Sequence, residues 1–340
     1  MLFAVLIVKG QGFSARPGVR SKNRITVIIP TVGRKTLPKC LDSILHQTRI
    51  PDQILVIDGS RGNRVEELCR EYPRVGVIKQ TSKRQSVVQA MNLGITSARG
   101  DIAAFIDDDA VAHCDWLRQL VKPYEVEDKV GGVGGVPIIT PSEETDPNVR
   151  EVLTGFDGAT SHLVKIAGAI YSSFFQENLP FLRLSHCGVC VVEPKGISGR
   201  ITDVDFMLGC NMSFLVDAIR KVGGFDEGYI EHGECMEVDA CVRLKRIGFR
   251  ILLNPKAIVY HAISKENALR SVRGRSRNLY YFVAKNSRTG LRLGLLRANL
   301  YLTARTIFYI AMFLRTKDRD YMRGVKGAAE GCMLMLRPPT

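Results

Sequence analysis

No apolar run in the sequence is long enough to cross a lipid bilayer. The N-terminal run covers only Leu2–Val8, and a later stretch, Ala298–Leu314, contains Arg305 near its middle. A membrane-spanning helix needs about 20 consecutive apolar residues, and a charged arginine at its centre is strongly disfavoured. The sequence therefore argues against an integral membrane protein, and we interpret residues 1–23 as an N-terminal leader.

The sequence also lacks the cysteine pattern of a disulfide framework or of a structural zinc site. Its nine cysteines are odd in number and scattered, and several fall within predicted strands or helices. Cys187 and Cys190 form one CxxC motif, but a second such motif, which a zinc site of this type usually needs, is missing. This usage is typical of reduced thiols that pack as small apolar residues, and hence of a cytoplasmic protein.

Acidic residues are scarce in the last part of the chain. From Arg270 to Thr340 there are 15 lysines and arginines but only three acids, Asp318, Asp320 and Glu330. The preceding 269 residues carry a net charge of only +2 out of the total of +14. The positive charge therefore belongs to one segment and needs a local explanation.

The first half of the chain alternates predicted strands with predicted helices, without internal repeats or low-complexity segments. Hydrophobic periodicity and turn residues predict strands at 24–30, 53–60, 75–80 and 101–106, with helices at 36–48, 65–72 and 86–100. Because the links between them are short, this order predicts an α/β fold with a parallel sheet that helices cover on both faces.

The second half is less regular. We predict strands at 131–138, 206–215, 249–254 and 257–261. In the segment 216–227 we predict a short helix that Gly223 and Gly224 stop, and then a helix at 236–248 that Gly248 ends. From about residue 269 to the end the pattern is helical. Residues 141–205 show no clear period.

Polar residues follow three of the predicted strands. Thr31 follows the first, Asp58 ends the second, and three aspartates, Asp107, Asp108 and Asp109, follow the fourth. Ligands of open α/β sheets lie beyond the carboxyl ends of the strands. Alternate carboxylates such as Asp107 and Asp109 can share Mg²⁺ or Mn²⁺, which would cancel their repulsion and neutralise a diphosphate. The alternative is an acidic cluster at the start of the following helix.

Three segments together resemble the family 2 glycosyltransferases of the GT-A fold. They are "VIIPTVGRKTLPKCLDSILHQTRIPDQILVIDGS", "NLGITSARGDIAAFIDDD" and "GCNMSF…VGGFDE…VDACVRLKRIGFRI…AIVYH", in this order between Arg24 and His261. The resemblance implies a GT-A domain at 24–265 with a Rossmann-like, mostly parallel central sheet, followed by a C-terminal helical extension. It also implies metal-dependent, inverting transfer of a sugar from a nucleoside-diphosphate sugar to a hydroxyl acceptor, such as a lipid-linked glycan or a polysaccharide precursor.

The resemblance assigns expected roles to residues of this sequence. Asp107, Asp108 and Asp109 match the motif that holds the metal and the sugar nucleotide, with Mg²⁺ or Mn²⁺ on Asp107 and Asp109. The other expected contacts are His261 with the metal, and Pro30, Thr31, Arg34, Asp58, Arg84 and Asn211 with the nucleotide sugar. Three of these have structural alternatives: Arg84 as part of an exposed basic loop pair, Asn211 as a backbone ligand at a strand bend, and His261 as a histidine at the edge of the core.

The catalytic base is expected at the start of a late helix. The family usually shows an acidic pair followed by x-Asp-Leu-x-x-Arg, and this chain has "GECMEVDACVRL". Matching Asp239 and Arg243 to the end of that pattern places Glu237 at the base position, with Met236 in place of the preceding acid. Glu234, three residues earlier, is the alternative base. We interpret Asp239 and Arg243 as a structural i,i+4 pair.

The basic segment, residues 266–340, mixes arginines with apolar stretches. We interpret it as a basic amphipathic extension that lies in the membrane interface through residues 270–320, with arginines facing anionic head groups. Ordinary core packing and a true membrane span are the alternatives. With an interface helix, the protein would be cytoplasmic and peripheral at the inner face of the cell membrane.

Two other function classes compete with the transferase. A nucleotidyltransferase also uses strand-end aspartates and a metal, but its glycine-rich signature is only faint in residues 31–36. A nucleic-acid-binding protein would interleave aromatics with basic residues, as Tyr280, Tyr281 and Phe282 do here. We expect no nucleic-acid partner. A transferase fold that binds its donor without turnover is the remaining alternative, because Met236 departs from the family pattern.

Overall fold

The computed structural model describes residues 23–81, 86–141, 179–185, 188, 190–192, 196–263, 272–288 and 295–336. Within them, the strands are β1 Ile25–Thr31, β2 Gln53–Asp58, β3 Val75–Lys79, β4 Ile102–Ile106, β5 Ala110–Ala112, β6 Val130–Pro141, β7 Thr202–Asp203, β8 Asn211–Leu215 and β9 Arg250–Ile263. The helices are α1 Leu37–Leu45, α2 Arg64–Cys69, α3 Val87–Ser97, α4 Trp116–Val126, α7 Val216–Lys221, α8 Met236–Arg246, α10 Val272–Arg288, α11 Leu295–Thr316 and α12 Arg319–Leu336.

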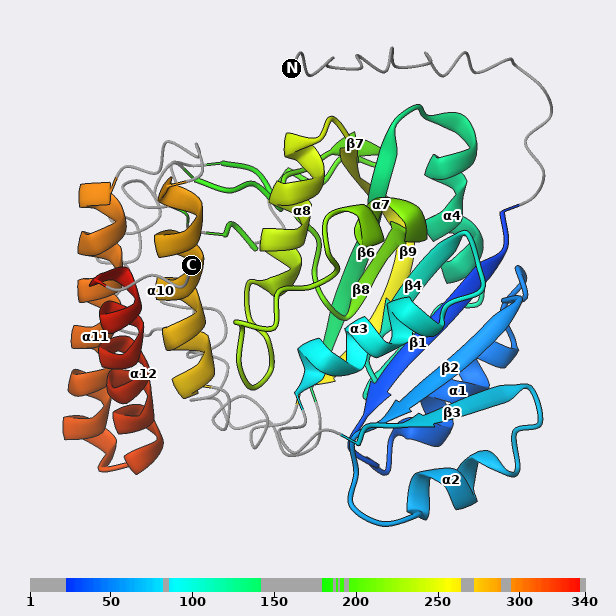
Figure 1. The fold of residues 1–340 in the computed structure, drawn as a ribbon, viewed down its shortest axis with the longest axis horizontal. Coiled ribbons are helices and arrows are strands. Elements are labelled where there is room, and N and C mark those ends of the chain that lie inside the picture. Colours follow the sequence, from blue (N-terminus) through cyan, green and yellow to red (C-terminus); the bar gives the residue numbers. More distant parts are fainter. Residues whose placement is uncertain are drawn as a thin grey trace, which may run out of the picture.

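The strands form one central sheet in the order β3-β2-β1-β4-β8-β6-β9-β5, with β7 beside β9 (Figure 1). The first four strands pair in parallel, which confirms the prediction for the first half of the chain. β8 runs antiparallel between β4 and β6, whereas β6 and β9 are parallel. The fold is therefore the predicted α/β class, with a reversed strand inserted in the second half.

Alternate residues of the buried strands face opposite layers, as the period of two requires. On β1, Ile25, Val27 and Ile29 pack in a core with α1 and α4, whereas Ile28 packs in the core that contains α3 and α8. Because both faces are covered, these strands are apolar throughout and lack alternation of apolar and polar residues.

Several predicted elements differ from the observed ones. The strand predicted at 206–215 begins only at Asn211, and the two strands predicted at 249–254 and 257–261 are one continuous strand, β9. By contrast, the short helix predicted from residue 216 is confirmed: α7 ends at Lys221, and Gly223 and Gly224, the two glycines predicted to stop it, take φ values of +84° and +73° that favour glycine. The short strand β5 was not predicted.

The basic segment forms three helices, of which the first belongs to the core. Leu279, Phe282 and Val283 of α10 are buried in the same apolar cluster as α3 and α8. Figure 1 shows α10 between α8 and the pair α11 and α12. None of the helices that the structure describes is long and apolar enough to span a membrane. The predicted leader and the predicted boundary at 265 lie outside the described residues.

Candidate functional site

Three consecutive aspartates follow β4, and two of them, Asp108 and Asp109, bind residues at the end of β1 and in the loop after it. Asp108 is 1% exposed, and its two oxygens accept from the Thr31 hydroxyl at 2.5 Å and from Arg34 Nη1 at 2.5 Å. The same Arg34 nitrogen lies 3.1 Å from Asp109 Oδ2. Because β1 and β4 are parallel neighbours, their carboxyl ends share one edge of the sheet, and the predicted residues meet there.

His261 brings a ring nitrogen to the same carboxylates. Its Nε2 lies 3.0 Å from Asp109 Oδ1 and 3.7 Å from Asp107 Oδ2. β5 pairs antiparallel with β9 and sets Ala110 opposite His261, so residues 152 positions apart in the sequence meet. One potential ligand atom from each of Asp107, Asp109 and His261 lies within 4.8 Å of the others.

Burial and charge separate the pKa values of this group. Burial raises the pKa of Asp107 to about 6. Burial would also raise the pKa of Asp109, but the hydrogen bond to His261 and the charge of Arg34 outweigh it and hold that pKa below its usual value. Burial opposes the charged form of His261, yet Asp109 and Cys210 raise the imidazole pKa to about 11. Arg34 and His261 thus stand as positive partners beside the three carboxylates.

The three side chains fit a divalent cation. Two carboxylates and an imidazole supply oxygen and nitrogen ligands; Mn²⁺ accepts both, while Mg²⁺ prefers oxygen. Asp108 also contributes repulsion that raises the pKa of Asp107, and a cation shared by Asp107 and Asp109 would relieve it. The predicted metal residues thus form a possible Asp-Asp-His metal site.

The residues expected to contact the nucleotide base lie at neighbouring strand ends. Thr31 at the end of β1 is opposite Asp58 at the end of β2, and Pro30 precedes it as a buried strand residue. Asp58 is fully buried; its Oδ1 accepts from the backbone N–H of Ser60 at 2.7 Å and its Oδ2 from Lys79 Nζ at 2.6 Å. An ion pair therefore holds the expected base-binding carboxylate in place.

Of two further residues predicted to contact the nucleotide sugar, the structure describes Asn211 but not Arg84. Asn211 is fully buried, and its side-chain amide accepts from Trp116 Nε1 at 2.8 Å and donates to the Ala257 carbonyl at 2.9 Å. Its side-chain oxygen and nitrogen are thus both engaged within the protein, on β8. Arg84 lies in residues 82–85, outside the described residues.

The start of α8 carries the two candidate bases. Burial, and then the charge of Glu234, raise the pKa of Glu237 to about 8. The charge of Asp107 raises it further, so the base candidate is within electrostatic reach of the carboxylate cluster. Glu234 is 41% exposed, and its Oε1 lies 3.3 Å from Arg275 Nε of α10. Glu237 is thus a half-buried carboxylate with a raised pKa, whereas Glu234 is ion-paired with Arg275.

The predicted structural pair on α8 is confirmed. Arg243 Nε donates to Asp239 Oδ2 at 2.8 Å, and Asp239 is fully buried. This pair engages Asp239 and leaves Glu237 and Glu234 as the two candidate bases of the motif.

Three residues of the site were missed by sequence reasoning. Lys79 lies opposite Asp58 in the register of β2 and β3, so the predicted strand pairing contained a signal for it. Cys210, whose side chain contacts His261, lies within the motif that carries Asn211, but a buried cysteine gives no signal of its own. Arg275 reaches Glu234 from α10, and nothing in the local sequence indicates this long-range contact.

Comparison with known proteins gives a consistent result. Residues 26–187 match the family model "Glycosyl transferase family 2". A relative from Haloferax volcanii, "Glucosyl-dolichyl phosphate glucuronosyltransferase", is 25% identical over 251 residues, which are 71% of this chain and 69% of the relative. "Glycosyltransferase AglE" from the same organism is 26% identical over 148 residues, which are 42% of this chain and 46% of the relative.

Two solved structures share the fold. One is the mannosyltransferase PcManGT from Pyrobaculum calidifontis in complex with GDP-Man and Mn²⁺, with a TM-score of 0.55 and 18% sequence identity. The match covers 97% of this chain and 80% of the mannosyltransferase chain. The other is GalNAc-T7 with UDP, GalNAc and Mn²⁺, with a TM-score of 0.55 and 15% sequence identity. The match covers 80% of this chain and 52% of the GalNAc-T7 chain. The predicted GT-A fold class is confirmed.

Proposed function

The chain belongs to the family 2 glycosyltransferases through residues 26–187, and we propose that it transfers a sugar, with inversion, from a nucleoside diphosphate to a hydroxyl acceptor. One observation carries the proposal. A cluster of Asp107, Asp109 and His261 suited to a divalent cation lies within electrostatic reach of Glu237, a half-buried carboxylate with a raised pKa. These are the two groups that the reaction needs: one beside the departing diphosphate and one beside the acceptor.

The strand ends β1, β2 and β4 form the donor side. Thr31 and Asp58 receive the nucleoside, while Arg34 faces the phosphates. The expected phosphate contact of Arg84 stays a prediction from the sequence, because this residue lies outside the described residues. Asp107, Asp109 and His261 would hold Mg²⁺ or Mn²⁺, which neutralises charge on the diphosphate when bound. The two structural neighbours were solved with GDP-Man and Mn²⁺ and with UDP, GalNAc and Mn²⁺, which supports this donor class.

The start of α8 forms the acceptor side. As the acceptor oxygen bonds to the anomeric carbon, the bond from that carbon to the diphosphate oxygen breaks and the electron pair leaves with the diphosphate. Glu237 takes the hydroxyl proton in the same displacement, so one step inverts the configuration. A base whose pKa lies near the working pH suits this role.

A lipid-linked acceptor at an anionic membrane surface fits the outer face of α11. Ile307 and Leu314 are each 60% exposed, and Leu300 is 46% exposed on the same side of the helix. Arg305 is turned toward the Tyr301 and Tyr309 hydroxyls, to which it donates at 3.1 Å and 3.0 Å, so it does not interrupt this apolar face. The exposed basic residues Arg315, Lys317 and Arg319 follow it.

We propose that this face rests on anionic lipid and that the protein is cytoplasmic and peripheral. Basic charge beside an exposed apolar face complements a surface with negative head groups above acyl chains. The name of the Haloferax volcanii relative includes a dolichyl phosphate acceptor, which supports a lipid-linked substrate here.

A panel of sugar nucleotides tests the proposal. Each nucleotide is added with Mn²⁺ or Mg²⁺, and thermal stabilisation and slow donor hydrolysis are measured. We expect one nucleotide class to raise the unfolding temperature only with metal and to be hydrolysed. The absence of both effects across the whole panel would overturn the proposed activity.

A further inference from the structure

The loop of residues 228–235 leads directly into α8 and carries Glu234, while Glu237 lies in the first turn of the helix. We propose that α10 is a positioning element of the catalytic centre, in which Arg273, Arg275 and Asn278 hold this loop. The inference rests on the proposed function of Glu237. It differs from the interpretation of the C-terminal segment as a membrane-associating extension, because it assigns α10 a role in turnover.

The loop has a backbone conformation that requires support. Glu231, Gly233 and Cys235 have φ values of +55°, +70° and +69°, and Cys235 directly precedes Met236, the first residue of α8. A left-handed conformation is unfavourable for residues with a Cβ, and it persists only where surrounding contacts impose it. The position of the helix start, and with it Glu237, therefore depends on what holds the loop.

Asn278 fixes the centre of the loop with two hydrogen bonds. Its Oδ1 accepts from the Ile230 backbone N–H at 3.0 Å, and its Nδ2 donates to the Ile230 carbonyl at 2.9 Å. Asn278 is fully buried. Arg277 also donates to the Gly228 carbonyl, so two consecutive α10 side chains bind the loop backbone.

Glu231 is held by the first turn of α10. Its two oxygens accept from Arg273 Nη1 at 2.7 Å and from the Gly274 backbone N–H at 2.8 Å. Arg273 also lies 2.9 Å from Glu330 of α12, so α12 fixes the side chain that fixes the loop. These bonds hold the first of the three left-handed residues.

Arg275 extends the same contacts to the acids of the site. It lies 3.3 Å from Glu234, which in turn acts electrostatically on Glu237. Arg275 is only 19% exposed, and among the described residues its buried Nε has no hydrogen-bond partner beyond this ion pair. This pairing keeps Glu234 engaged and leaves Glu237 as the base.

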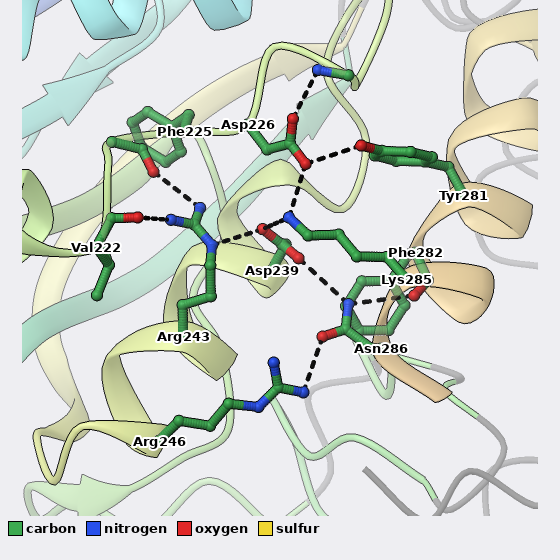
Figure 2. Close-up of polar contacts among 12 residues, drawn as sticks. Val222, Phe225, Asp226, Asp239, Arg243, Arg246, Tyr281, Phe282, Lys285 and Asn286 are labelled. Carbon is green, nitrogen blue, oxygen red and sulfur yellow. Dashed lines mark hydrogen bonds and ion pairs between the residues drawn. The ribbon is translucent and has the colours of Figure 1, made fainter. Parts of the chain in front are cut away.

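A second set of contacts fastens α10 to α8 itself. Figure 2 shows Asp239 of α8 accepting from Arg243, Lys285 and Asn286, at 2.8, 2.9 and 3.2 Å. Lys285 also donates to Asp226 at 2.6 Å, just before the loop, and Tyr281 donates to the same oxygen at 2.9 Å. Both ends of the segment from Asp226 to α8 are thus attached to one helix.

Arg273 is the residue to change, because its side chain is 34% exposed and the variant is expected to fold. Arg273→Gln removes the bond to Glu231, and Arg273→Lys retains a cation. Glu330→Gln removes only the α12 contact. Arg323→Gln is the matched control, since Arg323 lies on α12, 57% exposed, and pairs with Asp320 rather than with the loop.

Amide hydrogen exchange of residues 228–236 tests the support directly and needs no substrate. We expect exchange at Ile230 and its neighbours to be at least about tenfold faster in Arg273→Gln and unchanged in Arg323→Gln. Equal exchange in the two variants would overturn the inference, whether or not the protein turns over a sugar nucleotide.

Kinetics with the hydrolysed sugar nucleotide and Mn²⁺ separates positioning from stability. We expect Arg273→Gln to lower kcat by about tenfold or more with KM for the donor within about twofold, and Arg273→Lys to restore most of kcat. A merely structural role would lower the unfolding temperature and leave kcat at lower temperature unchanged. That result, with Arg273→Lys no better than Arg273→Gln, would contradict the inference.

Discussion

The donor side and the acceptor side of the site are built in different ways. The donor side consists of the ends of parallel strands, where Thr31 and Asp108 meet because β1 and β4 are neighbours. The acceptor side consists of a loop with left-handed residues that α10, some 40 or more positions later, holds in place. A regular sheet places its side chains by topology alone, whereas the proposed base is placed by specific long-range bonds. Substitutions should therefore affect the two sides differently.

The largest effect is expected on the donor side, at the carboxylate cluster. Asp109→Asn removes one of three possible metal ligands, and we expect turnover to fall by about a thousandfold or more while the fold remains intact. Donor hydrolysis with Mn²⁺ and circular dichroism measure the two. Asp217→Asn, an exposed aspartate at the start of α7, is the control. Full activity of Asp109→Asn, or of the wild type in excess EDTA, would contradict the proposed metal dependence.

On the acceptor side, the two glutamates should separate. We expect Glu237→Gln to lower kcat by about 100-fold to 10,000-fold with little change in donor affinity, because only the proton acceptor is lost. Glu234→Gln should have a much smaller effect, since Glu234 is paired with Arg275. Steady-state kinetics of both variants measures this. The opposite ranking would make Glu234 the base.

The raised pKa of Glu237 predicts a pH dependence with opposite signs for activity and stability. Activity should rise with pH through about 8, as the carboxylate forms, and Glu234→Gln should move this rise to lower pH by removing a negative neighbour.

Stability should change in the opposite direction. The folded state favours the protonated acid, so the contribution of Glu237 to stability is full below its ordinary pKa and is lost as pH rises toward 8. At pH 9, Glu237→Gln should therefore be more stable than wild type by at least about 1 kcal/mol in denaturant unfolding. A flat rate profile, or no gain in stability, would contradict the assignment.

The same contrast explains how much could be predicted from the sequence. The parallel half was predicted because buried strands and amphipathic helices leave local patterns, and Ser86 caps α3 as its sequence suggests, accepting from the Gln89 N–H. Thr36 has the same cap signal at α1, yet its backbone is helical and its buried hydroxyl makes no hydrogen bond. The strand-end acids followed from topology.

The rest depended on contacts between distant residues. The reversed strand β8 pairs with β4 and β6, and the contact of His261 with Asp109 follows from the pairing of β5 with β9; no local pattern encodes either pairing. The apolar residues of α10 indicated a helix, but they did not indicate whether it packs on lipid or on α8. The arginines of α10 contribute to a general basic charge in the sequence, and only the fold shows that Arg273 and Arg275 bind acids of the loop.

A smaller effect is expected at the nucleoside end of the donor side. Asp58→Ala should weaken binding of the free nucleoside diphosphate by about 1–3 kcal/mol, because a charge-assisted hydrogen bond to the base is lost. Titration calorimetry measures it. Because Asp58 also pairs with Lys79, Lys79→Met serves as the control for loss of the ion pair alone. Equal affinities of Asp58→Ala and wild type would exclude a contact with the base.

The smallest effect per residue is expected at the outer face of α11, which lies beyond both sides of the site. The intact chain should sediment with vesicles that contain anionic lipid, and high salt should weaken this, because each basic residue near the surface contributes about 1 kcal/mol. A chain ending after Asn286 should lose the interaction, but it would also uncover apolar surface, since Ala298, Leu302 and Ala328 pack in the core that includes α10.

Point variants on the exposed face of α11 are therefore the sharper test. We expect Ile307→Ser with Leu314→Ser to reduce vesicle binding several-fold, and donor hydrolysis in solution to stay unchanged, because neither side chain reaches the site. If these variants bind anionic vesicles as the wild type does, α11 does not rest on lipid and α10 alone connects the basic segment to function.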